Sequence, residues 1–109
     1  MSNFRQRDTL ASQHLGMHLG HTAAGLVRTE IRKVFQGYLY WNHRSLLFIA
    51  DDPIFTNGNL LKLDFDEIGI PKSKYLLWNG ELDFGNGMWI FHGQKKHIKD
   101  MESVVNRSR

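Results

Sequence analysis

The sequence predicts an α+β domain, in which a small curved antiparallel sheet or partly open barrel of five or six short strands is flanked by helices. Short apolar and aromatic runs separated by polar or glycine-containing turns fill residues 38–92. Apolar residues at helical spacing lie on both sides of this region. The 109 residues suffice for one core, so we expect a single domain over residues 22–109.

The N-terminal residues 1–21 are polar, with a weak apolar rhythm. They are expected to form either a disordered arm or a short helix that ends near Gly20, a common helix-stop residue. Gly16 lowers the helical propensity within this segment.

Residues 22–36 carry two competing patterns. Val27, Ile31 and Val34 recur at helical spacing, and Thr22 is a suitable N-cap. The alternation of apolar and charged residues around Val27 instead favours a strand. Because the helical spacing covers more residues, we predict a helix over 22–36 that Gly37 ends.

The region 38–92 is predicted to be β structure. Residues 38–41 and 46–49 form a hairpin around a polar four-residue loop, and Pro53 ends the second strand after Asp51 and Asp52. Residues 60–65 form a third strand.

Residues 74–92 are predicted to form an antiparallel meander that turns at Asn79-Gly80 and near Asn86, because Asn-Gly readily supplies the positive φ of a tight turn. Opposed residues share a face, which yields one apolar face made of Tyr75, Leu77, Leu82 and Phe84. With a three-residue second loop, Met88 and Ile90 join that face, while Trp89 and Phe91 join Leu76, Trp78 and two carboxylates on the other. A two-residue loop exchanges these assignments.

The C-terminal residues 94–106 are predicted to form an amphipathic helix, since Ile98, Met101 and Val105 lie at helical spacing. The chain contains no cysteine, no apolar run long enough to span a membrane and no N-terminal leader pattern. We therefore expect a cytoplasmic location and no membrane partner.

Charge is distributed unevenly. Residues 1–44 hold six Lys/Arg against two Asp/Glu, residues 45–93 hold three against seven, and residues 94–109 hold five against two. The basic ends either pack on the acidic middle or bind nucleic acid weakly. The candidate nucleic-acid contacts are Arg28, Arg32, Lys33, Lys95 and Lys96.

Three groups of polar residues are compatible with chemistry. His14, His18 and His21 would share one face of a helix, although without the acidic residue of a zinc-protease pattern. His43 with Asp51 and Asp52 could support metal-dependent hydrolysis. The acidic group Asp64, Asp66 and Glu67 does not have the spacing of a calcium loop.

The three groups are explained as well by surface residues and turns, and no phosphate loop or nucleophile motif is present. We therefore assign no catalytic residue, metal or cofactor.

An aromatic patch that one helix cannot cover predicts an interface of Leu76, Trp78, Trp89 and Phe91. The sequence thus favours a non-catalytic binding or assembly module that acts through protein contacts, with a homodimer as its expected form. One alternative is a small metal-dependent hydrolase or nuclease that uses His43, Asp51 and Asp52. The other is a nucleic-acid-binding accessory protein that uses the basic ends.

Overall fold

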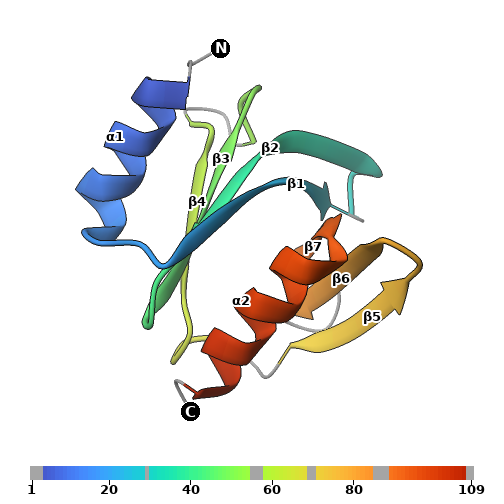
Figure 1. Ribbon diagram of the computed structural model, residues 1–109. Helices are drawn as coiled ribbons and strands as arrows, with labels where there is room; N and C mark the ends of the chain where they lie inside the picture. The colour runs from blue at the N-terminus through green and yellow to red at the C-terminus, as the bar shows by residue number, and fades with distance from the viewer. Residues whose placement is uncertain (1–3, 29, 55–57, 69–70, 85–88, 108–109) are drawn as a thin grey trace.

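The computed structural model describes residues 4–28, 30–54, 58–68, 71–84 and 89–107. This part of the chain forms one antiparallel sheet and two helices (Figure 1). In chain order, the elements are α1 (Phe4–Leu15), β1 (Gly20–Arg28), β2 (Lys33–Trp41), β3 (Ser45–Ala50), β4 (Leu60–Asp64), β5 (Lys72–Leu76), β6 (Asn79–Phe84), β7 (Trp89–Gln94) and α2 (Lys95–Arg107).

The seven strands lie in the order β4-β3-β2-β1-β7-β6-β5. The first four strands form one meander and the last three form another, and the pairing of β1 with β7 joins the two. The α+β class with an antiparallel sheet is confirmed. The predicted number of five or six strands is too low, because the segment expected to be helical contains most of a β-hairpin.

The predicted helix over 22–36 is wrong. β1 and β2 pair along their whole length, from Gly20 opposite Trp41 to Arg28 opposite Lys33. Strand pairing on both sides of β1 satisfies its backbone, and Leu26 is fully buried among core residues packed on the sheet, so tertiary contacts override the local helical spacing. Gly37 is therefore no helix stop but a point of close strand approach, where a Cβ atom would lie 2.2 Å from the Ile49 carbonyl oxygen.

The N-terminal segment does form a short helix, but α1 ends at Leu15 rather than near Gly20. Gly16 has a φ of +72°, and its N–H donates to the Ser12 carbonyl at 2.9 Å. This left-handed glycine closes the last turn of α1. Gly20 instead begins β1.

The hairpin of β2 and β3 matches its prediction. Trp41 pairs with Leu46, and the side-chain oxygen of Asn42 accepts the N–H groups of Arg44 and Ser45 at 2.8 Å. β3 ends at Ala50, directly before Asp51. The predicted third strand corresponds to β4, and the predicted C-terminal helix corresponds to α2, whose bounds differ by one residue at each end.

The two helices cover different parts of the sheet (Figure 1). α2 packs mainly on β6 and also on β7 and β1, where its apolar face completes the larger core. That face consists of Ile98, Met101, Val104 and Val105. α1 packs on β2 and β3, where Ala11 closes a smaller cluster with Tyr40, Leu47 and Ile49. Neither described helix has the length and apolarity needed to cross a membrane.

Candidate functional site

The turn between β5 and β6 exposes three consecutive apolar side chains. Leu76, Leu77 and Trp78 are 72%, 77% and 84% exposed. Leu76 pairs with Asn79, so Leu77 and Trp78 are the two central residues of the turn. We call Leu76, Leu77 and Trp78 the apolar tip. Core packing does not explain why these three residues are apolar, since an exposed apolar side chain does not stabilise the fold by burial.

The apolar tip is held in place by its neighbours. The Trp78 carbonyl accepts the N–H of Lys95 at 2.7 Å, which joins the turn to the start of α2. The Tyr75 hydroxyl donates to a Glu102 carboxylate oxygen at 2.8 Å, which joins β5 to the middle of the same helix. Burial, followed by this bond to Glu102, raises the pKa of Tyr75 to about 12.

Lysines surround one side of the apolar tip. Lys95, Lys96 and Lys99 line a cavity of about 550 Å³ together with Trp78. The ammonium nitrogens of Lys95 and Lys99 lie 6.0 and 5.4 Å from the centre of the Tyr75 ring. The site is therefore an apolar projection with a basic flank.

The strands that carry the tip hold opposite charges in two columns. Lys72 and Lys74 lie on β5, and their cross-strand partners on β6 are Asp83 and Glu81. By the two-residue period of a strand, all four share a face with Leu76. Within the described residues, neither helix packs on that face, since α1 lies on β2 and β3, and α2 packs on the opposite side of β6.

The antiparallel meander is confirmed, but its first turn lies two residues earlier than predicted, at Leu77-Trp78. Gly80 lies inside β6 and pairs with Tyr75, and the Tyr75 ring and the Ile98 side chain pack over it. A Cβ atom there would lie 2.9 Å from the ring and 3.0 Å from Ile98. The predicted turn near Asn86 and the predicted place of Met88 lie outside the described residues.

The predicted interface is only partly exposed. Leu76 and Trp78 project into solvent, but Phe91 is fully buried, and Trp89 packs against the larger core. The cause is the register of β6 and β7, in which Phe84 pairs with Trp89 and Leu82 with Phe91. Four residues separate Phe84 from Trp89 in the sequence, and this even number puts Trp89 and Phe91 on the apolar face, contrary to the three-residue expectation.

The predicted nucleic-acid contacts fall into two groups. Arg28, Arg32 and Lys33 lie around the turn from β1 to β2, next to Trp89 at the start of β7. Lys95 and Lys96 follow the end of β7. The Arg28 guanidinium pairs with Glu30, which reduces the net charge of the first group. The length of β7 keeps the two groups apart, so they form no continuous basic stripe.

The three N-terminal histidines lie on different elements. His14 is in α1, His18 in the following loop and His21 in β1. His18 lies 3.6 Å from a carboxylate oxygen of Asp8, and its ring centre is 6.1 Å from that of His21. Among the described residues, these histidines are not part of a group of three metal-donor side chains, whereas Asp64, Asp66 and Glu67 are.

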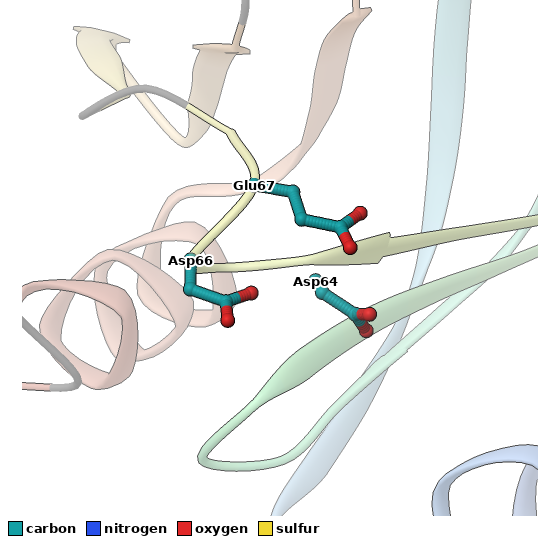
Figure 2. A group of neighbouring side chains, drawn as sticks. All are labelled: Asp64, Asp66 and Glu67. Atoms are coloured by element: carbon teal, nitrogen blue, oxygen red, sulfur yellow. The ribbon is translucent and has the colours of Figure 1, made fainter.

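Figure 2 shows Asp64, Asp66 and Glu67 at the end of β4 and in the turn that follows. Their nearest carboxylate oxygens lie within 4.8 Å of one another, and the Ser45 hydroxyl donates to Asp64 at 2.5 Å. Asp66 and Glu67 are exposed, so solvent screens their mutual repulsion. An exposed acidic group of this kind is common on protein surfaces.

The residues of the hydrolase hypothesis are separated. His43 precedes β3, while Asp51 and Asp52 follow its last residue. The six residues of β3 put about 20 Å between these positions, too far for one catalytic centre.

The comparisons with known proteins support the fold of this chain but give no information on its function. No protein-family model and no curated protein matches the chain. The crystal structure of the C-terminal domain of an unknown protein from Leishmania infantum is similar, with a TM-score of 0.64. The match covers 94% of this chain and 98% of that one at 15% sequence identity, which shows a shared fold alone.

Proposed function

We propose that this domain is a non-catalytic binding and assembly module that acts through protein contacts at the apolar tip and self-associates as a homodimer. The observation that carries the proposal is the exposure of Leu76, Leu77 and Trp78 in a turn that the strands and α2 hold in place. A tryptophan presented in this way can bury a large area at little entropic cost, which is typical of interface hot spots.

The charge columns beside the tip support a second copy of the chain as the partner. A two-fold axis parallel to β5 and β6 would place Lys72 and Lys74 of one copy over Asp83 and Glu81 of the other. Opposite charges would then meet around the buried tips. Edge-to-edge pairing through β5 is less suitable, because lysines on an edge strand discourage the addition of another strand.

The proposal includes a cytoplasmic location and no cofactor. The absence of cysteine suits a reducing compartment, and a docking function needs no bound group. The hydrolase and nucleic-acid hypotheses lack comparable support, because the groups they require are spread over separate ends of β3 and β7.

Sedimentation equilibrium tests the proposal. At about 100 μM chain, where a dimer with micromolar affinity is mostly formed, we expect the mass of two chains. Trp78→Ser should shift the protein to monomer with unchanged circular dichroism, because the side chain is exposed. Met17→Ser is the matched control, since Met17 is 87% exposed but lies outside the tip.

A wild-type protein that stays monomeric at this concentration would refute the homodimer. A Trp78→Ser variant that dimerises as strongly as the wild type would remove the tip from the interface.

A further inference from the structure

A groove of about 870 Å³ lies between the first part of β1 and one face of α2. It is separate from the apolar tip, none of whose residues line it. The strand wall consists of Gly20, His21, Thr22 and Ala23, and the helix wall includes His97, Asp100, Val104 and Arg107. The groove therefore combines a strand edge with a polar helix face.

The strand wall is the part of β1 that extends past its ladder with β7. β1 pairs with β2 from Gly20 to Arg28, whereas its ladder with β7 covers only Ala24 to Val27. Among the described strands, β7 is the one on this side of β1, and the chain turns into α2 directly after Gln94. The Ala23 carbonyl oxygen points to this side, since a Cβ atom on Gly93 would lie 3.1 Å from it.

The two walls match in length. Four strand residues span about 13 Å at ~3.3 Å each. The helix residues from His97 to Arg107 span about 15 Å at ~1.5 Å each. Their spacing of three, four and three residues puts His97, Asp100, Val104 and Arg107 on one stripe of α2.

The lining suits an extended peptide whose alternate side chains differ. Leu19, which is 48% exposed, supplies apolar surface, whereas Trp41 and Val104 are almost fully buried by their own neighbours. His21 and Tyr38 supply polar rings on the other face of the sheet. The Asp100 carboxylate can accept hydrogen bonds from a hydroxyl or a backbone N–H of the peptide.

The cationic end of the groove indicates where a negative charge would lie. α2 starts beside Ala23, where β7 ends, and runs away from it, so Arg107 lies at the far end of the helix wall. His43 lines the same groove and follows Trp41, the partner of Gly20, by two residues. The Arg107 Nε–H donates to the Ser103 carbonyl at 3.4 Å, which leaves its other guanidinium N–H groups as candidate donors to a carboxylate, with His43 as a second polar group in the lining.

We propose that this groove binds the extended C-terminal tail of another protein, antiparallel to β1, with the terminal carboxylate held by Arg107 and His43. The tail would lie beside β1 in the position that β7 would occupy if it continued beyond Gln94, and β7 is itself antiparallel to β1. By the alternation of the ladder, His21 and Ala23 direct their main-chain groups to this side; the Ala23 carbonyl is used by the ladder with β7, so the tail would pair with the Ala23 N–H and with His21. This binding mode combines strand addition with capture of a carboxylate, and it goes beyond the self-association proposed above.

A four-residue probe tests the proposal on the full chain. Acetyl-Thr-Val-Thr-Val with a free carboxylate is titrated into ¹⁵N-labelled protein, and the same peptide with a C-terminal amide is the matched control. We expect chemical-shift changes at Thr22, Ala23 and Ser103 with the free acid, and binding about fivefold weaker with the amide, the upper end of what one exposed ion pair contributes. Equal binding of the two peptides would contradict carboxylate capture.

Two variants locate the site. Ser103→Trp fills the groove from an exposed helix position and should abolish binding. Arg107→Ala should weaken binding of the free-acid peptide by about fivefold and leave binding of the amide peptide unchanged. Lys99→Ala is the control. It removes the same charge from α2, but Lys99 lines the cavity beside Trp78 and not the groove.

Trp78→Ser should bind the probe as the wild type does, so this proposal and the homodimer can fail separately. Shift changes confined to the apolar tip, or none at millimolar peptide, would overturn the groove proposal.

Discussion

The hairpins β2–β3 and β5–β6 differ in how many of their faces are covered. All six residues of β3 are buried, whereas Lys72, Ser73, Lys74 and Leu76 of β5 are exposed. Both hairpins contribute one face to the larger core. The second face of β2–β3 lies under α1, which packs through Ala11, while the described chain supplies no helix for the second face of β5–β6.

This difference shows that helix placement decides which part of the sheet remains available for partners. The sequences of β3 and β5 agree with this difference in how many faces are covered. β3 contains an uninterrupted apolar run, which is typical of a strand covered on both faces. β5 alternates lysines with Ser73 and Tyr75, which is typical of a strand covered on one face.

The largest effect is expected at Gly37 in the fully covered hairpin. A Cβ atom there would lie 2.2 Å from the Ile49 carbonyl oxygen and 2.8 Å from the Ala50 Cα, and backbone cannot move aside as a side chain can. Gly37→Ala should lower the free energy of unfolding by about 3 kcal/mol. Urea unfolding followed by tryptophan fluorescence measures this change.

Gly58→Ala is the control for Gly37→Ala, since nothing lies within 4 Å of a Cβ atom at Gly58. Its unfolding free energy should stay within about 0.5 kcal/mol of the wild type. Equal losses in the two variants would show that β2 and β3 are not packed as closely as described.

Gly37 also shows why part of the fold could not be predicted. A glycine after residues at helical spacing indicates a helix stop when only neighbouring residues are considered. Its actual role depends on Ile49, which lies twelve residues further along and pairs next to it through a hairpin. The β2–β3 hairpin was predictable because the polar loop between two apolar runs is a local signal.

The site residues, too, could be predicted only where their position depends on neighbouring residues in the sequence. Leu76 could be placed on the uncovered face from strand alternation alone. The same alternation put Leu77 on the apolar face, which is wrong, because Leu77 and Trp78 form the turn and are both exposed. Phe91 could not be placed, because its face depends on the length of a loop. The groove beside α2 could not be predicted at all, since it exists where the ladder of β1 with β7 ends.

A moderate effect is expected where α1 covers the second face of β2–β3. Ala11 is fully buried on the cluster around Tyr40. Ala11→Gly should cost about 1–2 kcal/mol, the sum of a helix-propensity loss and a buried methyl group. Gln13→Gly makes the same backbone change at an exposed position and should cost only about 1 kcal/mol. If urea unfolding gives equal costs, α1 contributes no packing and the comparison of the hairpins fails.

A smaller effect is expected at Tyr75, which joins β5 to α2. Tyr75→Phe removes the hydrogen bond to Glu102 and should cost about 1 kcal/mol near neutral pH. Because the pKa of Tyr75 is raised to about 12 in the folded protein, its stabilising contribution is complete below pH ~10 and is lost as the pH rises from ~10 to about 12. The stability difference between wild type and variant should therefore shrink over this range.

Ultraviolet absorbance at alkaline pH gives an independent measurement. The wild type should show a tyrosine that ionises near pH 12, and the Tyr75→Phe variant should lack it. Tyr40 serves as an internal reference, because burial raises its pKa too and it remains in the variant. Identical titration curves would show that Tyr75 is not held by Glu102.

The smallest effect is expected at Leu77, and it is expected to be an increase in stability. Leu77 has a φ of +54°, a left-handed conformation that costs a leucine roughly 1–2 kcal/mol. Leu77→Gly removes this cost, while the greater freedom of glycine in the unfolded chain offsets about 0.4–1 kcal/mol of the gain. Because the side chain is 77% exposed, little packing is lost, and the net gain should be about 0.5 kcal/mol.

Leu76→Gly is the matched control for Leu77→Gly. Leu76 is similarly exposed but lies in β5, where glycine weakens a strand by roughly 0.5–1 kcal/mol. Opposite signs for the two variants in urea unfolding of monomeric protein would show that the turn keeps Leu77 at a cost in stability, as expected if the side chain serves a contact outside its own fold. A loss at both positions would mean that Leu77 packs within the domain, and the uncovered hairpin would then lose one of the three residues that make it a docking surface.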